Sequence, residues 1–300
     1  MKLICFYTEG IMSNNNNPKV SVYITTHNRL KKLKRAVDSV LKQNYQNIEI
    51  LICDDASSDG TKEYITTLAK GNSKVIYLRN DKNQGACVAR NMGIFKATGV
   101  FITGLDDDDE FTSNRISLFV NSWKDEFSFF CCNFIEKYSD GREKVYYKEK
   151  EGEIEGSYED LLFYNIASNQ VFTKTERLRG IGGFDIRARR LQDWDTWLRL
   201  SFKYGKFKRF QEATYVMHHD HKENEHRVSK SYPFSKALAD LKERNEEMYQ
   251  GKNLEFINFI ISTAERRAGL LESLSWSFSK RNPKYAVKYA LQFLPINRYD

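Results

Sequence analysis

The sequence is poor in proline and has no long hydrophobic run. Four prolines and sixteen glycines in 300 residues argue against a fibrous or disordered chain. No stretch approaches the roughly 18 apolar residues that a membrane span requires. The five cysteines are odd in number and lack the spacing of a zinc site, which favours free thiols in a reducing compartment. Residues 1–10 contain no small-residue cleavage site, so we expect no signal peptide and a cytoplasmic protein.

The net charge of +7 is unevenly distributed. Residues 266–299 contain seven Lys or Arg and one acidic residue. A basic surface suits nucleic acid, anionic lipid or a diphosphate substrate, and charge alone does not choose among them. The densest motifs, between residues 54 and 109, are acidic where a phosphate backbone would have to dock. We therefore expect no nucleic-acid partner.

Short apolar runs alternate with amphipathic stretches in the first 110 residues. The expected strands are 20–25, 48–53, 75–79 and 100–105, and the expected helices are 30–43, 61–70 and 86–97. This alternation predicts an α/β fold, a mostly parallel sheet flanked by helices. Ligands bind beyond the carboxyl ends of such strands, where the polar clusters 25–29, 54–59 and 106–109 fall.

The rest of the chain has a different pattern. Residues 127–172 combine aromatic-rich strands with charged turns, and 193–203 read as a helix. Further helices are expected at 234–249, 254–274 and 283–294. We expect a dispensable tether at 1–17, an α/β domain at 18–230 and a helical C-terminal extension at 231–300.

Four consecutive aspartates, Asp106–Asp109, follow a predicted buried strand. Adjacent carboxylates raise one another's pKa unless a cation neutralises them. On an extended chain Asp106 and Asp108 point to one side, where carboxylate oxygens suit Mg²⁺ or Mn²⁺. The alternative is a solvated acidic turn, as most short acidic runs are.

A second acidic cluster, Asp54-Asp55, follows the strand at 48–53. A carboxylate there can accept from a base N–H or a ribose hydroxyl. Asp59 and Thr61 are more typical of a turn and a helix cap. A metal-dependent phosphatase of the haloacid-dehalogenase type is disfavoured, because Ser58 stands where its motif requires the first of two aspartates.

Six motifs in order make the chain resemble the family 2 glycosyltransferases of the GT-A fold, the bacterial surface-polysaccharide type. They lie at 20–29, 54–61, 83–91, 99–109, 182–185 and 192–199. The resemblance implies a Rossmann-like domain with a nucleotide-binding half at 18–110 and an acceptor-side half at 111–230. It also implies inverting, metal-dependent transfer from a nucleotide-sugar, a UDP-sugar in particular, to a saccharide hydroxyl. The acceptor could be lipid-linked, as in O-antigen, capsule or lipopolysaccharide synthesis.

The resemblance implies a nucleotide pocket at the strand ends. Asp55 would accept the N3–H of uracil, and Arg90 would reach the ribose or the diphosphate. The implied nucleotide-binding residues are Thr25, His27, Arg29, Asp55, Arg90, Asp106 and Asp107.

The resemblance also implies a metal site and a base. Asp108 would be the main ligand of Mn²⁺ or Mg²⁺, with Asp106 and His219 contributing and His218 as the second candidate among the histidines. Asp193 would be the catalytic base, and Gln192 stands where the family commonly has Glu. On the residues alone, Asp193 could instead cap its helix. An inactive nucleotide-sugar binding module is a further alternative.

The basic C-terminal segment could dock on the anionic cytoplasmic face of a membrane. Residues 283–294 place apolar side chains such as Val287 and Leu291 on one side and Lys284 and Lys288 on another. Trp276 and Phe278 lie just upstream. The alternative is a helix packed on the catalytic domain.

Overall fold

The computed structural model describes residues 17–148, 152–167, 170–220 and 232–293. The first half alternates strands and helices, and each predicted element is confirmed to within two residues at either end. The strands are β1 (Val20–Thr26), β2 (Ile48–Asp54), β3 (Val75–Arg79) and β4 (Phe101–Asp106). The helices between them are α1 (Leu30–Leu41), α2 (Thr61–Gly71) and α3 (Ala86–Lys96).

These strands form the parallel part of one sheet. β1 pairs in parallel with β2 and with β4, and β2 pairs in parallel with β3. Every residue of β2 is buried, because helices cover both faces of the sheet. Alternate side chains enter opposite cores: Leu51 and Cys53 join one hydrophobic cluster, and Ile50 and Ile52 join the other.

The second half completes a ten-stranded mixed sheet. Its strands are β5 (Glu110–Phe111), β6 (Phe130–Tyr138), β7 (Glu143–Val145), β8 (Ile154–Gly156), β9 (Phe172–Lys174) and β10 (Phe207–His219). The order is β3-β2-β1-β4-β9-β6-β10-β5, with β7 paired to β6 and β8 to β10. β9 runs antiparallel between β4 and β6, and β10 runs parallel to β6. The predicted α/β fold is therefore confirmed.

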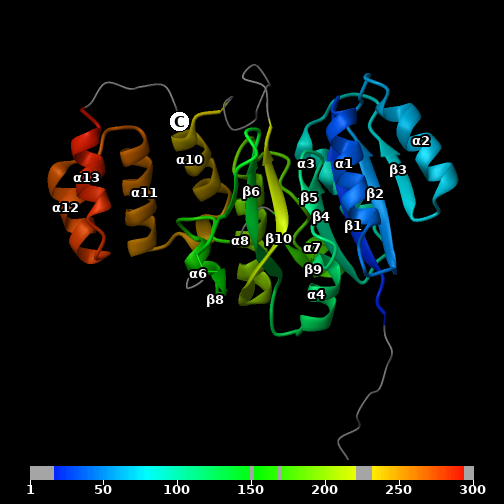
Figure 1. The fold of residues 1–300 in the computed structure, drawn as a ribbon. Coiled ribbons are helices and arrows are strands. Elements are labelled where there is room, and N and C mark those ends of the chain that lie inside the picture. The colour runs from blue at the N-terminus through cyan, green and yellow to red at the C-terminus, as the bar shows by residue number, and fades with distance from the viewer. Residues whose placement is uncertain (1–16, 149–151, 168–169, 221–231, 294–300) are drawn as a thin grey trace, which may run out of the picture.

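Helices of the second half lie beside the sheet and beyond one end of it (Figure 1). They are α4 (Arg115–Ser122), α6 (Tyr158–Leu161), α7 (Thr175–Gly180), α8 (Gln192–Tyr204), α10 (Phe234–Arg244), the 3₁₀ turn η1 (Glu246–Met248), α11 (Lys252–Ala264), α12 (Leu270–Ser279) and α13 (Lys284–Leu291). The predicted helix at 193–203 is confirmed, and the one at 234–249 ends at Arg244 and continues as η1.

The single helix predicted at 254–274 is wrong, because the chain breaks between α11 and α12. Arg266 has a φ of 60°, and the N–H of Arg267 donates to the carbonyl of Ser262 at 2.8 Å. A left-handed residue with this closing bond is a common helix end, but glycine usually occupies that position. The sequence pattern therefore carried no stop signal there.

The C-terminal helices form an extension at the end of the molecule opposite α2 (Figure 1). α10 and α11 contribute Leu238, Leu241 and Ile257 to the main core. Phe256, Phe259 and Tyr285 form a small separate cluster with Trp276 between α11, α12 and α13. In the part of the chain that the structure describes, no helix combines the length and hydrophobicity needed to span a bilayer.

Candidate active site

The three polar clusters predicted at the strand ends lie together. In the sheet register Thr25 is beside Asp106 of β4 and Cys53 of β2, and Thr26 is beside Asp54. The carboxyl ends of β1, β2 and β4 therefore form one edge, as the strand pattern predicts.

The four aspartates form a tight turn. The N–H of Asp109 donates to the carbonyl of Asp106 at 3.1 Å, so the expectation of an extended chain beyond Asp106 is wrong. Exposure nevertheless alternates: Asp107 and Asp109 are buried, whereas Asp106 and Asp108 are half-buried. The two carboxylates expected to share a side are thus the two that remain accessible.

Asp107 and Asp109 anchor this turn. The Thr26 hydroxyl donates to Asp107 at 2.7 Å, and the Tyr215 hydroxyl and the His218 N–H donate to Asp109 at 2.7 and 2.9 Å. Burial and the neighbouring Asp108 raise the pKa of Asp107 to about 7. Burial also raises the pKa of Asp109 well above its usual range. Contact of Asp107 with a nucleotide stays a prediction.

Arg29 and Arg35 hold the accessible side of the turn. Nη1 of Arg29 lies 3.2 Å from Oδ1 of Asp107 and 3.1 Å from Oδ2 of Asp108. Nη2 of Arg35 donates to the carbonyl of Asp108. These contacts offset part of the negative charge of the turn, and contact of Arg29 with a nucleotide stays a prediction.

The residues present fit a divalent cation only in part. Among the residues that the structure describes, no group of three or more His, Cys, Asp or Glu is placed to hold a metal ion. Asp106 and Asp108 supply two accessible carboxylates. Mg²⁺ and Mn²⁺ suit oxygen ligands, and Mg²⁺ is usually held by one or two carboxylates together with substrate phosphates and water. The turn therefore fits a cation that arrives with a diphosphate.

The two described histidines of β10 face different ways. The ring of His219 stacks on Tyr138 with centroids 4.7 Å apart, and its Nε2 lies 3.2 Å from Glu136. The ring of His218 instead contacts Glu110 at 2.6 Å. The ring of His219 is thus engaged by Tyr138 and Glu136, and its role as a metal ligand stays a prediction. His221 and His226 lie outside the described residues.

Asp55 organises the loop after β3. Its carboxylate accepts from the side chain of Asn80 at 2.8 Å and from the N–H groups of Gln84 and Gly85 at 2.9 and 2.7 Å. The Asp55 carbonyl contacts Nδ1 of His27 at 2.7 Å. Since a carboxylate has about four acceptor positions, most of them are already used. Acceptance of a base N–H by Asp55 stays a prediction.

Arg90 links the acidic turn to α8. Its Nη2 donates to Oδ1 of Asp106 at 3.1 Å and its Nη1 donates to Oε1 of Gln192 at 2.7 Å. Although burial would lower the pKa of Arg90, the nearby Asp193 and Asp106 outweigh burial and hold that pKa above its usual range. Gln192, where an acid was expected from the resemblance, thus has a specific structural partner.

Asp193 lies in the first turn of α8 but does not cap it. The helix begins after Leu191, which has a φ of 62°, and no side chain caps its N-terminus. Oδ1 of Asp193 is buried and has no hydrogen-bond partner within the described residues. Burial raises the pKa of Asp193 to about 6, with Arg90 opposing and Asp106 adding to the rise. The capping alternative is wrong, and the role of Asp193 as a base stays a prediction.

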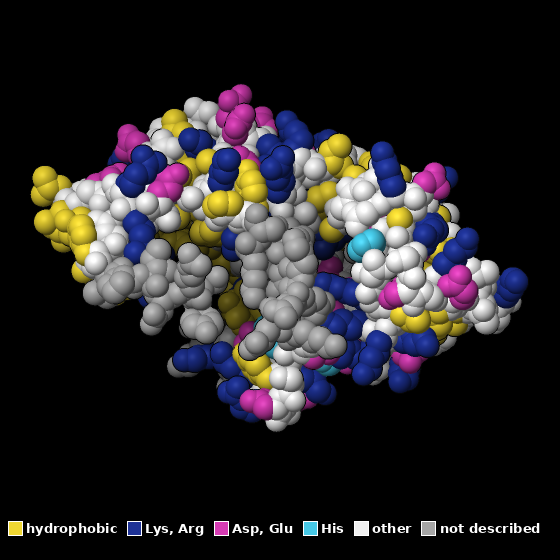
Figure 2. Space-filling view, turned by 90° about the horizontal axis from the view of Figure 1, so that it is seen from above, with side chains coloured by type: hydrophobic (Ala, Val, Ile, Leu, Met, Phe, Trp, Pro, Cys, Tyr) yellow, Lys and Arg dark blue, Asp and Glu magenta, His cyan; other side chains and the backbone are white. Residues whose placement is uncertain are grey.

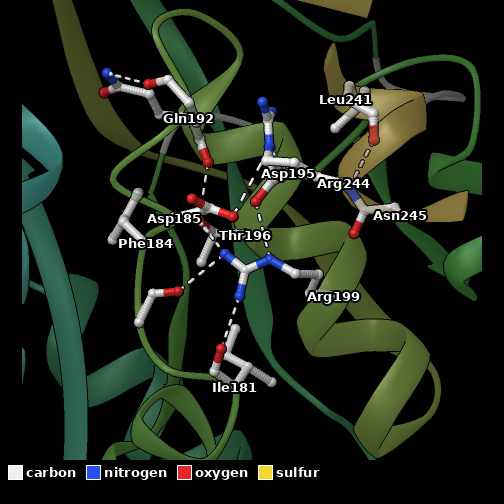
Figure 3. A network of polar contacts seen from close by, with 12 residues as sticks. Ile181, Phe184, Asp185, Gln192, Asp195, Thr196, Arg199, Leu241, Arg244 and Asn245 are labelled. Carbon is white, nitrogen blue, oxygen red and sulfur yellow. Dashed lines mark hydrogen bonds and ion pairs between the residues drawn. The ribbon is translucent and has the colours of Figure 1, made fainter. Parts of the chain in front are cut away.

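The neighbouring acids have structural partners instead. Figure 3 shows Asp195 between α8 and α10, where it accepts from Arg199 at 2.9 Å, Arg244 at 3.1 Å and Asn245 at 3.0 Å. Asp185 pairs with Arg187 at 2.6 Å. Asp195 and Asp185 therefore both have hydrogen-bond partners, whereas Oδ1 of Asp193 has none among the described residues.

Gln170 is a site residue that the sequence pattern did not reveal. Its Nε2 donates to Oδ1 of Asp106 at 3.1 Å, and its Oε1 accepts from the Tyr23 hydroxyl at 3.3 Å. A Cβ at Gly104 would lie 2.2 Å from Oε1 of Gln170, so only glycine leaves room for it. No local motif marks Gln170, because it reaches Asp106 from 64 residues away.

Comparison with known proteins gives a consistent result. Residues 21–220 match the family described as Glycosyl transferase family 2. The chain is 38% identical over 219 residues to the putative colanic acid biosynthesis glycosyl transferase WcaA of Escherichia coli K12, covering 69% of this chain and 75% of that protein. It is 33% identical over 162 residues to the GalNAc(5)-diNAcBac-PP-undecaprenol beta-1,3-glucosyltransferase of Campylobacter jejuni, covering 53% and 52%.

Solved structures share the fold. TarS 1-349 of S. aureus in complex with UDP-GlcNAc has a TM-score of 0.64 at 17% identity, covering 91% of this chain and 79% of that one. The mannosyltransferase PcManGT of Pyrobaculum calidifontis in complex with GDP-Man and Mn²⁺ has a TM-score of 0.58 at 14% identity, covering 93% and 85%. The fold of the described chain is therefore GT-A.

Proposed function

Because the chain belongs to glycosyl transferase family 2, and is thus a glycosyltransferase, we propose that it transfers a sugar with inversion from a nucleotide diphosphate to a saccharide hydroxyl. The observation that carries this proposal is Asp193. It is a carboxylate with a raised pKa and a buried, unpartnered oxygen, linked through Arg90 to the acidic turn.

Asp193 acts as the general base. It takes the proton of the acceptor hydroxyl while the hydroxyl oxygen bonds to the anomeric carbon of the donor sugar. The bond from that carbon to the diphosphate oxygen breaks, and the nucleotide diphosphate leaves. A single displacement of this kind inverts the anomeric centre, and it needs only one base on the acceptor side.

The donor lies at the edge formed by β1, β2 and β4. We assign its nucleotide to Thr25, His27, Arg29, Asp55, Arg90, Asp106 and Asp107, and favour a UDP-sugar, as in the TarS complex. Asp106 and Asp108 would hold Mn²⁺ or Mg²⁺, with His219 as a further candidate ligand. When bound, the cation offsets negative charge on the leaving diphosphate. Mn²⁺ in the PcManGT complex supports this assignment.

The acceptor is proposed to be a saccharide carried on a lipid diphosphate, in surface polysaccharide assembly. The support is the Campylobacter relative, whose name gives an undecaprenol-linked acceptor, and WcaA, whose name gives colanic acid biosynthesis. An acceptor of that kind is anchored in a membrane. The enzyme would then work at the cytoplasmic face of the membrane.

The extension offers a surface for such a membrane. Figure 2 shows hydrophobic side chains gathered at the end of the molecule formed by α12 and α13. Leu271 and Phe278 are 82% and 90% exposed, and Val287 and Leu291 are also exposed. Exposed Lys284 and Lys288 on α13 suit anionic headgroups. Trp276 does not take part, because it is half-buried among Phe256 and Phe259.

The decisive experiment follows release of the nucleotide diphosphate from a panel of nucleotide-sugars with Mn²⁺. A saccharide acceptor on a lipid diphosphate should accelerate release, and NMR of the product should show an inverted anomeric centre. Nucleotide-sugar binding without any release or transfer would instead indicate an inactive binding module.

A further inference from the structure

The two oxygens of the Asp106 carboxylate have different surroundings. Oδ1 accepts from Nη2 of Arg90 and from Nε2 of Gln170, both at 3.1 Å. Oδ2 has no hydrogen-bond partner among the residues that the structure describes, and the side chain is 24% exposed. Two donors thus hold one oxygen of the carboxylate and leave the other for a ligand.

The two neighbours of the Gln170 amide fix the direction in which it points. A carboxylate that pairs with Arg90 only accepts hydrogen bonds, so the end of the amide that faces Asp106 must be the NH₂ group. The amide oxygen then accepts from the Tyr23 hydroxyl, 3.3 Å away. Turning the amide over would bring its oxygen against the carboxylate. Only one orientation of Gln170 therefore satisfies both neighbours.

Tyr23, which orients the amide, is itself held in one position. It is buried between the backbones of α3 and β4: a Cβ at Gly93 would lie 2.8 Å from Cβ of Tyr23, and a Cβ at Gly104 would lie 2.4 Å from its Cζ. Its ring also meets the ring of Phe184 edge-on, with centroids 6.5 Å apart. Burial raises the pKa of Tyr23, so the hydroxyl keeps its proton and remains a donor.

The main chain of Gln170 is fixed as well. Its carbonyl accepts from Nη2 of Arg115 at 3.0 Å, and Nη1 of the same guanidinium donates to the Thr214 hydroxyl on β10 at 3.0 Å. Arg115 is buried, and its guanidinium lies over the rings of Phe111 and Phe119 at 4.7 and 4.9 Å. The backbone and the amide oxygen of Gln170 are therefore both tied to buried groups, which directs its N–H to the acidic turn.

We propose that Gln170 is a positioning residue of the donor site, a statement that rests on the proposed function. Together with Arg90 it holds Oδ1 of Asp106 and so keeps Oδ2 available to the nucleotide diphosphate or its cation. Gln170 is only 1% exposed, so it acts through Asp106 and does not itself meet the donor. Without its N–H the carboxylate could turn more freely, and binding of the donor would have to restrict it again.

The test measures binding of UDP with Mn²⁺ by calorimetry to wild type, Gln170→Met, Tyr23→Phe and the double variant. Methionine is unbranched like glutamine and has no N–H, so Gln170→Met should weaken binding about tenfold through loss of a hydrogen bond to a charged group. Tyr23→Phe should weaken binding about threefold, because Tyr23 reaches Asp106 only through Gln170. In the Gln170→Met background, Tyr23→Phe should then have no further effect.

The matched control is Asn133→Leu, which removes another buried side-chain amide, one that donates to the carbonyl of Tyr147 at 2.8 Å. This variant should unfold at a lower urea concentration than wild type and bind UDP as wild type does, which separates lost packing from lost positioning. In the transfer assay Gln170→Met should raise the KM for the nucleotide-sugar and leave the KM for the acceptor unchanged.

Two results would overturn the proposal. One is wild-type UDP affinity in Gln170→Met when Asp106→Ala has lost it. The other is additive losses from Tyr23→Phe and Gln170→Met, which would indicate two independent packing effects. If Gln170→Met did not fold, Tyr23→Phe alone would decide, and unchanged affinity in that variant would contradict the proposal. Failure of the proposed function is separate: it appears as wild-type protein that binds no nucleotide diphosphate with Mn²⁺.

Discussion

Arg90 and Asp106 form an ion pair, with Nη2 and Oδ1 3.1 Å apart, that joins α3 to the acidic turn. The same guanidinium donates to Gln192 at the start of α8. The donor edge and the helix that carries Asp193 are therefore connected by one side chain. This connection holds Asp193, the proposed base, in a fixed position relative to the acidic turn.

Replacing Asp193 by Asn should slow transfer severely and leave the fold intact. Loss of a general base typically lowers the rate by about a hundred- to ten-thousandfold. Burial raises the pKa of Asp193 to about 6 in the folded state, so its charge opposes folding at pH 8. The melting temperature of the variant at pH 8 should therefore equal or exceed that of wild type. Initial rates, donor affinity and thermal unfolding check this, and wild-type transfer by Asp193→Asn would refute the assignment.

The pH dependence of kcat/KM should report the ionisation of Asp193. The base must be deprotonated to accept a proton, and its pKa is raised to about 6. We expect kcat/KM to be level above pH 7 and to fall about tenfold per pH unit well below 6. The residual rate of Asp193→Asn should lack this acid limb. An acid limb that persists unchanged in the variant would assign it to another group.

Substitutions at Asp108 and Asp109 should have different effects: the first should weaken nucleotide binding with Mn²⁺, and the second should lower stability. Asp108→Ala should lose most Mn²⁺-dependent nucleotide affinity and still fold. Asp109→Ala should keep that affinity but unfold more easily, because the buried Tyr215 hydroxyl loses its acceptor. An unsatisfied buried group costs about 1–3 kcal/mol. Titration with nucleotide and Mn²⁺, together with urea unfolding, tests both, and equal loss of affinity in the two variants would contradict this division.

Asp195 should matter for stability. It is fully buried and pairs with Arg199 and Arg244, whose side chains are also largely buried. Removing one partner of a buried ion pair costs about 3–5 kcal/mol, so Asp195→Ala should lower the free energy of unfolding by that order. The control is Asp125→Ala, which breaks an exposed pair with Lys174 and should cost less than about 1 kcal/mol. If Asp195→Ala and Asp125→Ala lowered the free energy of unfolding in urea by the same amount, the result would argue against a stabilising network between α8 and α10.

The exposed end of α12 should govern membrane binding. Phe278→Ser and Leu271→Ser should reduce co-sedimentation with vesicles that contain anionic lipid, and added salt should weaken the wild-type interaction. Phe95→Ser is the control, because Phe95 is exposed on α3, away from the extension. Wild-type protein that stays in the supernatant at every salt concentration would exclude a membrane surface here.

The parallel half of the fold could be predicted because each strand is a continuous apolar run that stops at a polar cluster. The strands β8 and β9 could not be predicted, because a strand of three residues is too short to show an alternating pattern. The break at Arg266 was missed because a non-glycine residue takes the left-handed conformation there. Local pattern thus sufficed for the strands that alternate with helices, whereas it did not reveal the 13-residue strand β10.

For the site, sequence position identified the acids but not their geometry. The turn at Asp106–Asp109 depends on Tyr215 and His218, which lie more than 100 residues along the chain. The contact of Gln170 with Asp106 likewise comes from a distant segment. A local pattern shows which groups reach an edge of the sheet, whereas distant donors decide which of them remain free for a ligand.

The pairing of Arg29 with Asp108 makes cation binding at the turn an exchange. A divalent ion that arrives there must take over a carboxylate already engaged by a guanidinium. Its binding free energy would therefore include the cost of weakening the contact between Arg29 and Asp108. If a nucleotide diphosphate left together with such a cation, Arg29 would remain in place to pair with Asp108 again, and the turn would keep its shape.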